Sequence, residues 1–184
     1  TLPKMVAAGS GLDVLSHALE SLTALPFDQR PAAERPELRP AYQGANPISD
    51  IWSSKAIEMV AANIVRAIHD PEDDEARSQM LLASAYAGIG FGNAGVHLPH
   101  GMSYPVSGMV RGYNPPGYPT DHPIIPHGIS GSRNAPAVFR FTAAANPQRH
   151  LLGARLMGVD VSAVAEEDAG EVLAGAIIDL MKQT

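Results

Sequence analysis

The sequence predicts an all-α fold, a multi-helix bundle, and three observations support this prediction. Apolar residues recur at the spacing of one helix face over several long stretches. A capping residue followed by a proline, which suits the first helical position, occurs at Asn46-Pro47 and again at Asn146-Pro147. Alternating β-branched runs and Asn-Gly or Asp-Gly turns are absent from the sequence, which argues against strands and hairpins. With 184 residues, 45% of them hydrophobic, the chain is long enough for one domain with a substantial core.

The first predicted helix covers residues 9–25. We expect Ser10 to cap its N-terminus, an apolar stripe follows, and Pro26 ends the helix. Residues 27–45 contain three further prolines, each of which fixes a φ angle and interrupts regular structure. The sequence therefore predicts a loop between the first helix and the second.

Two long helices are predicted next. The second covers residues 46–68, with Ile51 among its inward-facing positions. The third begins at acidic residues 72–75, whose charge favours the positive end of a helix dipole, and extends toward Val96.

The second half of the chain predicts one loop and three shorter helices. Residues 102–126 are rich in glycine, proline and tyrosine, which is typical of an irregular, functional loop. Helices are expected over residues 134–145, 147–157 and 167–182.

Charge and composition exclude several function classes. The formal net charge is -6 and no lysine or arginine cluster is present, so we expect no nucleic-acid partner. Without cysteine the chain forms neither disulfides nor thiolate metal sites. Glycine, histidine and asparagine interrupt the longest apolar run, so we expect no membrane span. With no signal-peptide pattern in the sequence, these features favour a cytoplasmic protein.

One aspartate and three histidines form a candidate metal site. Asp13 and His17 are four residues apart in the first predicted helix, which places both side chains on one face. His100 and His127 follow later, each directly before a glycine. One carboxylate and three imidazoles suit Fe(II) or Zn(II). Spacing alone leaves open an N-terminal electrostatic role for Asp13, because such pairs also arise by chance.

The other four histidines have simpler interpretations. His97 is three residues before His100 and is an alternative or additional ligand. His69 lies at a helix end, where an imidazole can bond to carbonyl groups. We expect His122 to be solvated in the loop and His150 to lie on the surface.

Several segments of the sequence resemble the iron-containing (group III) alcohol dehydrogenase family, and most closely its hydroxyacid-oxoacid transhydrogenase branch. The matching segments are residues 11–20, 92–101, 126–128, 100–105, 113–122 and 135–142. The resemblance implies that Asp13, His17, His100 and His127 bind the metal, with Fe(II) preferred to Zn(II). It also implies the dehydroquinate synthase-like α domain, here over residues 1–184. An N-terminal domain that binds NAD is then absent from this chain.

The chain departs from the family pattern at two places. Many members have a histidine four residues after the third ligand, where this chain has Tyr104. The polar stretch Gly131–Asn134 replaces an expected apolar run, and we expect it to alter the structure near His127.

The resemblance implies hydride transfer between an alcohol or hydroxy acid and a nicotinamide. In the transhydrogenase branch, 4-hydroxybutyrate and 2-oxoglutarate become succinate semialdehyde and 2-hydroxyglutarate. Tyr104, then His97, then water are candidates for moving the proton, and Arg111 is a candidate for binding the substrate carboxylate. An NAD-dependent primary alcohol dehydrogenase and a non-catalytic helical domain are the alternatives. The resemblance is also compatible with a homodimer.

Overall fold

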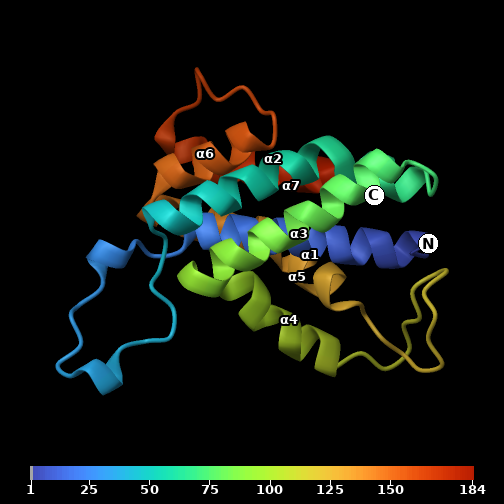
Figure 1. Cartoon of the computed structure of the whole chain (residues 1–184), viewed down its shortest axis with the longest axis horizontal. Coiled ribbons are helices and arrows are strands. Elements are labelled where there is room, and N and C mark those ends of the chain that lie inside the picture. Colours follow the sequence, from blue (N-terminus) through green and yellow to red (C-terminus); the bar gives the residue numbers. More distant parts are fainter. Residues whose placement is uncertain (1) are drawn as a thin grey trace.

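Helices make up the architecture of the computed structural model, which describes residues 2–184 (Figure 1). Over that range there is no strand, only one isolated bridge between Pro26 and Ala45. The all-α prediction is therefore confirmed. The helices are α1 Lys4–Thr23, α2 Pro47–His69, α3 Asp74–Ala94, α4 Leu98–Gly108, α5 His127–Thr142, α6 Pro147–Leu156 and α7 Ala169–Gln183. Short 3₁₀ turns are η1 Phe27–Gln29, η2 Pro36–Leu38, η3 Ala143–Ala145 and η4 Glu166–Asp168.

Helix α1 runs through the middle of the molecule and is buried around most of its circumference. It contacts α2 and α3, and it also contacts α5 and α6 (Figure 1). Burial of apolar side chains between these helices is the main stabilising contribution. The largest fully buried apolar side chains are Leu19, Leu22, Ile57, Val60, Ile64, Phe139, Leu173 and Ile177.

The helix-start signals differ in how well they predict the structure. Asn46 caps α2 through a capping box, because its side chain accepts from the Ile48 and Ser49 amides. The predicted cap at Ser10 is wrong: α1 begins at Lys4, and the Ser10 hydroxyl bonds back to the Val6 carbonyl inside the helix. A serine within a helix bonds to the preceding turn in this way, so the residue type alone does not mark the start.

Two further predictions about local structure are wrong. The predicted loop over residues 102–126 overlaps α4, which carries Pro99 in its first turn, where a missing N–H costs little. Packing against α5 offsets the interior Pro105. Ile51 is 67% exposed rather than inward-facing, because it lies on the outer side of α2.

Helix α5 begins at His127, seven residues before the predicted start at residue 134. The stretch Gly131–Asn134 therefore continues a helix rather than disturbing one. Ser130 and Ser132 are both buried, and Ser130 bonds to the His127 carbonyl. Small polar residues allow this part of α5 to lie close to α1 and α4, which hydropathy alone did not predict.

The segment between α1 and α2 is an extended loop, as the prolines predicted (Figure 1). Its base is closed by backbone hydrogen bonds from Phe27 N to Ala45 O at 3.0 Å and from Ala45 N to Leu25 O at 3.2 Å. Within residues 2–184, no helix has the length and apolar character that crossing a membrane requires.

Candidate metal centre

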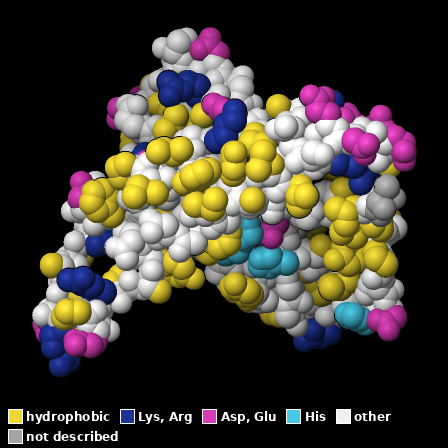
Figure 2. All heavy atoms as spheres, viewed as in Figure 1, with side chains coloured by type: hydrophobic (Ala, Val, Ile, Leu, Met, Phe, Trp, Pro, Cys, Tyr) yellow, Lys and Arg dark blue, Asp and Glu magenta, His cyan; other side chains and the backbone are white. Residues whose placement is uncertain are grey.

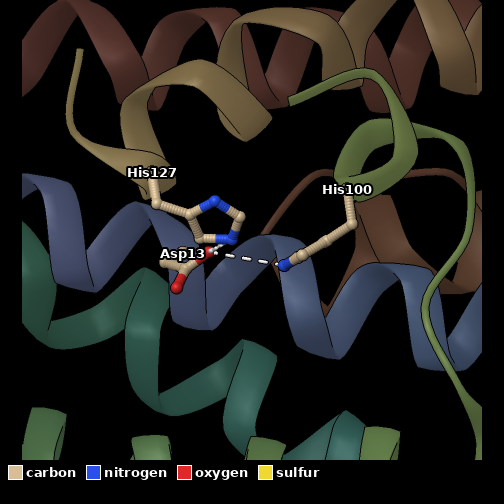
Figure 3. A group of neighbouring side chains, drawn as sticks. All are labelled: Asp13, His100 and His127. Atoms are coloured by element: carbon tan, nitrogen blue, oxygen red, sulfur yellow. Dashed lines mark ion pairs between the residues drawn. The ribbon is translucent and has the colours of Figure 1, made fainter. Parts of the chain in front are cut away.

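Three side chains from three different helices meet at the middle of α1 (Figure 3). Asp13 projects from α1, His100 from the first turn of α4, and His127 is the first residue of α5. The Asp13 Oδ1 atom lies 3.5 Å from His100 Nε2 and 3.7 Å from His127 Nε2. One ligand-type atom from each residue lies within 4.8 Å of the other two.

Close packing of α5 on α1 brings His127 to Asp13. A Cβ atom at Gly128 would lie 2.0 Å from the Gly9 carbonyl oxygen and 2.6 Å from Asp13 Cβ. Real side chains never approach so closely, so only glycine allows the two helices to lie this near each other. Gly128, the residue after His127, therefore sets how closely His127 approaches Asp13.

Two atoms of this cluster are buried without a hydrogen-bond partner. Asp13 Oδ1 and His100 Nε2 face each other, and neither is hydrogen-bonded to any group of residues 2–184. Leaving a buried polar atom unpaired costs about 1–3 kcal/mol, so such atoms mark sites where another group binds. A carboxylate oxygen and imidazole nitrogens are the donors that Fe(II) and Zn(II) accept. The residues present therefore fit a divalent metal ion.

His17 lies beside this group of three. Its Nδ1 atom is 3.8 Å from Asp13 Oδ2, and its ring centroid is 4.4 Å from that of His100. The ring stacks on Phe91 of α3, with centroids 4.2 Å apart. The fourth predicted ligand thus adjoins the cluster, although it is outside the set whose ligand atoms lie within 4.8 Å of one another.

The charges within the cluster shift its pKa values. Burial opposes ionisation of Asp13, but the neighbouring imidazoles of His100 and His17 outweigh it and hold the pKa of Asp13 below the usual value. Burial by itself would lower the pKa of His100, but the carboxylates of Asp13 and Glu20 beside the ring outweigh burial and raise this pKa to about 9. Burial also lowers the pKa of His17. A carboxylate that stays ionised beside these imidazoles supplies the negative charge that a cation needs.

Glu20 belongs to the same site, although the sequence analysis gave it no role. Its side chain is 0% exposed, and its Oε1 atom accepts from His100 Nδ1 at 2.5 Å and from Ser16 Oγ at 2.8 Å. A polar stripe on an otherwise apolar helix could have indicated it. Spacings of three or four residues lead from Asp13 to Ser16 or His17, and from these to Glu20.

Tyr104 and His97, the two candidates for proton transfer, differ in their exposure and in their neighbours. Tyr104 is 65% exposed, and its ring lies 5.9 Å from the His127 ring. His97 is half-buried, and its Nε2 atom lies 2.9 Å from Thr23 Oγ1. Its backbone N–H donates to Glu20 Oε2 at 2.7 Å, and His97 is not a member of the three-residue cluster. Burial lowers the pKa of His97.

The other candidate residues are not members of the three-residue cluster. Arg111 is exposed and donates to the carbonyls of Gly108, the last residue of α4, and of Val110. His122 is exposed, as expected, and pairs with Asp121. His69 bonds to the Gln183 carbonyl of α7.

The expectation that His150 lies on the surface is wrong. This residue of α6 is 1% exposed, and its ring packs against Phe139 of α5. Sequence neighbours such as Arg149 suggested a polar surface, but α6 turns this imidazole inward against Phe139.

A cavity of about 580 Å³ adjoins the cluster between α1, α2 and α3. Asp13 and His17 line it together with mostly apolar side chains, among them Val14, Met80 and Phe91. In Figure 2, histidine side chains occupy a hollow of the visible face that hydrophobic side chains border. A cavity of this size and character accommodates a small organic molecule beside the ionisable groups.

Residues 41–184 match the model of the Fe-containing alcohol dehydrogenase family, C-terminal part. A probable hydroxyacid-oxoacid transhydrogenase, mitochondrial, from Dictyostelium discoideum is 56% identical over 184 residues. That match covers 99% of this chain but only 34% of the relative, so the chain spans about a third of the relative's length.

Two solved structures share the fold over the whole chain. A 1,3-propanediol oxidoreductase superposes with a TM-score of 0.79 at 27% identity, covering 100% of this chain and 40% of that one. A sulfoacetaldehyde reductase from Bifidobacterium kashiwanohense, in complex with NAD+, gives a TM-score of 0.70 at 25% identity and covers 100% and 38%.

These comparisons correct one prediction and establish the family. The cytoplasmic location is wrong, because the name of the Dictyostelium relative places that enzyme in mitochondria. The absence of cysteine and of a signal-peptide pattern was too weak a basis for predicting a compartment.

The family match extends over most of the chain, and the fold and the identity to the relative agree with it. The chain belongs to the iron-containing alcohol dehydrogenase family.

Proposed function

We propose that residues 1–184 are the metal-binding helical domain of a hydroxyacid-oxoacid transhydrogenase. The observation that carries this proposal is the pair of buried, unpartnered atoms Asp13 Oδ1 and His100 Nε2, with His127 beside them. The identity of 56% to a relative of that name supports the reaction class. The proposed reaction converts 4-hydroxybutyrate and 2-oxoglutarate to succinate semialdehyde and 2-hydroxyglutarate.

Asp13, His100 and His127 would hold the metal ion, with His17 as the fourth ligand. Fe(II) is our preferred ion and Zn(II) the alternative, since both accept one carboxylate and several imidazoles. When bound, the ion supplies Lewis-acid chemistry at a substrate oxygen. Asp13 contributes the negative charge of the site. NAD would be bound mainly by an N-terminal domain that residues 1–184 do not include.

The apolar cavity beside Asp13 and His17 would bind the carbon chain of the substrate and exclude water from it. Overall, the hydroxy acid would lose a hydride and its hydroxyl proton and the oxo acid would gain both, so that the two half-reactions balance. The nicotinamide would supply the hydride-carrying chemistry when bound. We assign the proton transfer to Tyr104 Oη, because the Tyr104 ring lies beside His127 and is open to solvent. We do not assign this role to His97, because its Nε2 atom lies 2.9 Å from Thr23 Oγ1 rather than beside a member of the cluster.

An NAD-dependent alcohol dehydrogenase is the second candidate, and the structural likeness to a 1,3-propanediol oxidoreductase favours it. The two functions differ in what re-oxidises the cofactor. With a nucleotide-binding domain present, a transhydrogenase turns over 4-hydroxybutyrate only when an oxo acid such as 2-oxoglutarate is added. An alcohol dehydrogenase instead turns over with free NAD alone.

The first experiment is elemental analysis of anaerobically purified chain, with the wild type beside His100→Ala. We expect about one Fe or Zn per chain in the wild type and a reduced content in the variant. Wild-type protein that binds no metal, even after reconstitution, would favour the non-catalytic helical domain.

A further inference from the structure

Glu20 joins α1 to the first turn of α4 through a buried carboxylate. Four hydrogen bonds end on it, and both oxygens are used. Oε1 accepts from His100 Nδ1 at 2.5 Å and from Ser16 Oγ at 2.8 Å. Oε2 accepts from the backbone N–H of His97 at 2.7 Å and of His100 at 3.4 Å. A carboxylate that is 0% exposed is costly unless it is fully bonded, so such a residue has a specific role.

The carboxylate performs the capping that α4 does not provide for itself. His97, the residue before α4, makes no side-chain capping bond, and Pro99 follows within the first turn. The orphan N–H groups at a helix start need an acceptor, and a negative charge there is favoured by the helix dipole. Glu20 supplies both from another helix. His100, in that same first turn, is thereby held at a fixed position relative to Asp13.

The same carboxylate also decides which nitrogen of His100 is free. A carboxylate accepts hydrogen bonds and donates none, so the bond at Oε1 requires a proton on Nδ1. A metal binds the neutral form of the ring, in which a proton on Nδ1 leaves the lone pair on Nε2; this atom lies 3.5 Å from Asp13 Oδ1 and has no hydrogen-bond partner. Histidines that bind metals commonly have their second ring nitrogen bonded in this way.

We infer that Glu20 is a positioning residue of the metal centre, which sets the tautomer and place of His100 so that Nε2 is presented to the ion. The inference rests on the metal site proposed above. It assigns a function to a residue that lies two helical turns from Asp13 and touches neither substrate nor cofactor.

The variant Glu20→Gln tests the tautomer with little change in volume. An amide has one accepting oxygen and one donating nitrogen. If the oxygen keeps the bond to His97 N–H, the NH₂ group faces His100 Nδ1 and donates to it. The ring proton then moves to Nε2, the atom that faces Asp13. The helix cap survives, but the lone pair required by the metal is lost.

The measurement is the dissociation constant of Zn(II), obtained by competition with a chromophoric chelator. We expect Glu20→Gln to weaken Zn(II) binding about 10–100-fold, the usual effect of removing a partner behind a ligand. Ser16→Ala is the matched control, because it removes the other side-chain bond to Oε1 without altering His100. It should leave the affinity unchanged. Equal affinity of Glu20→Gln and wild type would overturn the inference.

A second measurement on the wild type needs no variant. Nitrogen-15 NMR of the Zn(II)-loaded chain reports which ring nitrogen of His100 carries the proton. A proton on Nδ1 supports the inference, and a proton on Nε2 overturns it. The two proposals fail in different ways. Wild-type chain that binds no Zn(II) refutes the metal site itself. Wild-type chain that binds Zn(II) without depending on Glu20 refutes only the positioning role.

Discussion

Asp13 Oδ1 and His100 Nε2 lie 3.5 Å apart in the interior, and neither atom has a hydrogen-bond partner among residues 2–184. One belongs to the central helix α1 and the other to the first turn of α4. Folding thus brings two atoms of the kind that bind metals close together and leaves both without a hydrogen bond.

Adding metal should stabilise the folded chain. An ion that binds only the native state raises the free energy of unfolding by RT ln(1 + [L]/Kd), about 2.7 kcal/mol at a hundredfold excess over Kd. We expect Fe(II) or Zn(II) to raise the melting temperature of the wild type, measured by thermal unfolding under anaerobic conditions. His100→Ala should abolish the rise, whereas His122→Ala, which alters an exposed histidine, should retain it. An equal rise in His100→Ala would argue against the site.

Gly128→Ala should separate α5 from α1. The added methyl group would lie 2.0 Å from the Gly9 carbonyl oxygen, so the helices must move apart, at a cost of about 1–3 kcal/mol for overpacking. Because His127 is the next residue, metal affinity should fall as well. Urea unfolding and chelator competition measure the two effects.

Gly131→Ala provides the control in the same helix. Its Cβ would lie 3.9 Å from Ser16 Oγ, an ordinary contact, so stability and affinity should both be retained. Equal effects of the two substitutions would mean that the Gly128 contact does not set the position of His127.

Tyr104→Phe should separate proton transfer from metal binding. The ring beside His127 is retained and only the hydroxyl is lost. In the protein with its nucleotide-binding domain, we expect turnover to fall by about 10²–10⁴-fold, as for loss of a general acid-base group. Zn(II) affinity should not change. Turnover equal to that of the wild type would exclude Tyr104 from the proton path and leave water in its place.

His150 should make the chain less stable in weak acid. Its Nδ1 donates to the Asn146 carbonyl, and its Nε2 lies 2.9 Å from Thr142 Oγ1. Burial lowers the pKa of this imidazole below 6.5, and the Asn146 carbonyl only partly opposes that effect. Below pH 6.5 the unfolded chain therefore binds a proton that the folded chain does not. The free energy of unfolding then falls as pH decreases, by at most about 1.4 kcal/mol per pH unit for one proton.

Urea unfolding between pH 7 and pH 5 measures this dependence. His150→Gln should reduce the slope of the free energy of unfolding against pH, and His122→Gln, at an exposed position, should leave the slope as it is. His97 is the neighbouring titratable group, whose pKa burial also lowers, so part of the slope should persist in His150→Gln. A slope identical to that of the wild type would show that His150 contributes nothing to it.

The sequence by itself determined the helical class and several helix boundaries. Asn46 caps α2 as predicted, because its side chain and the following proline act within a single turn. Asp13 and His17 share a face of α1 because their spacing is a property of the helix alone. The motifs around His100 and His127 also indicated the family that the comparisons then established. The metal-ligand assignment itself stays a prediction.

Only the tertiary structure decided how these local pieces combine. Helix α4 forms in a stretch rich in glycine and proline because contacts with α5 outweigh the weak local propensity. Gly128 brings His127 to Asp13 through a contact between helices more than a hundred residues apart in sequence, which no local pattern encodes. Glu20 resembles any other helical glutamate until α4 covers it and bonds to both oxygens. Helix formation depends on neighbours along the chain, whereas the candidate metal centre depends on packing between distant segments.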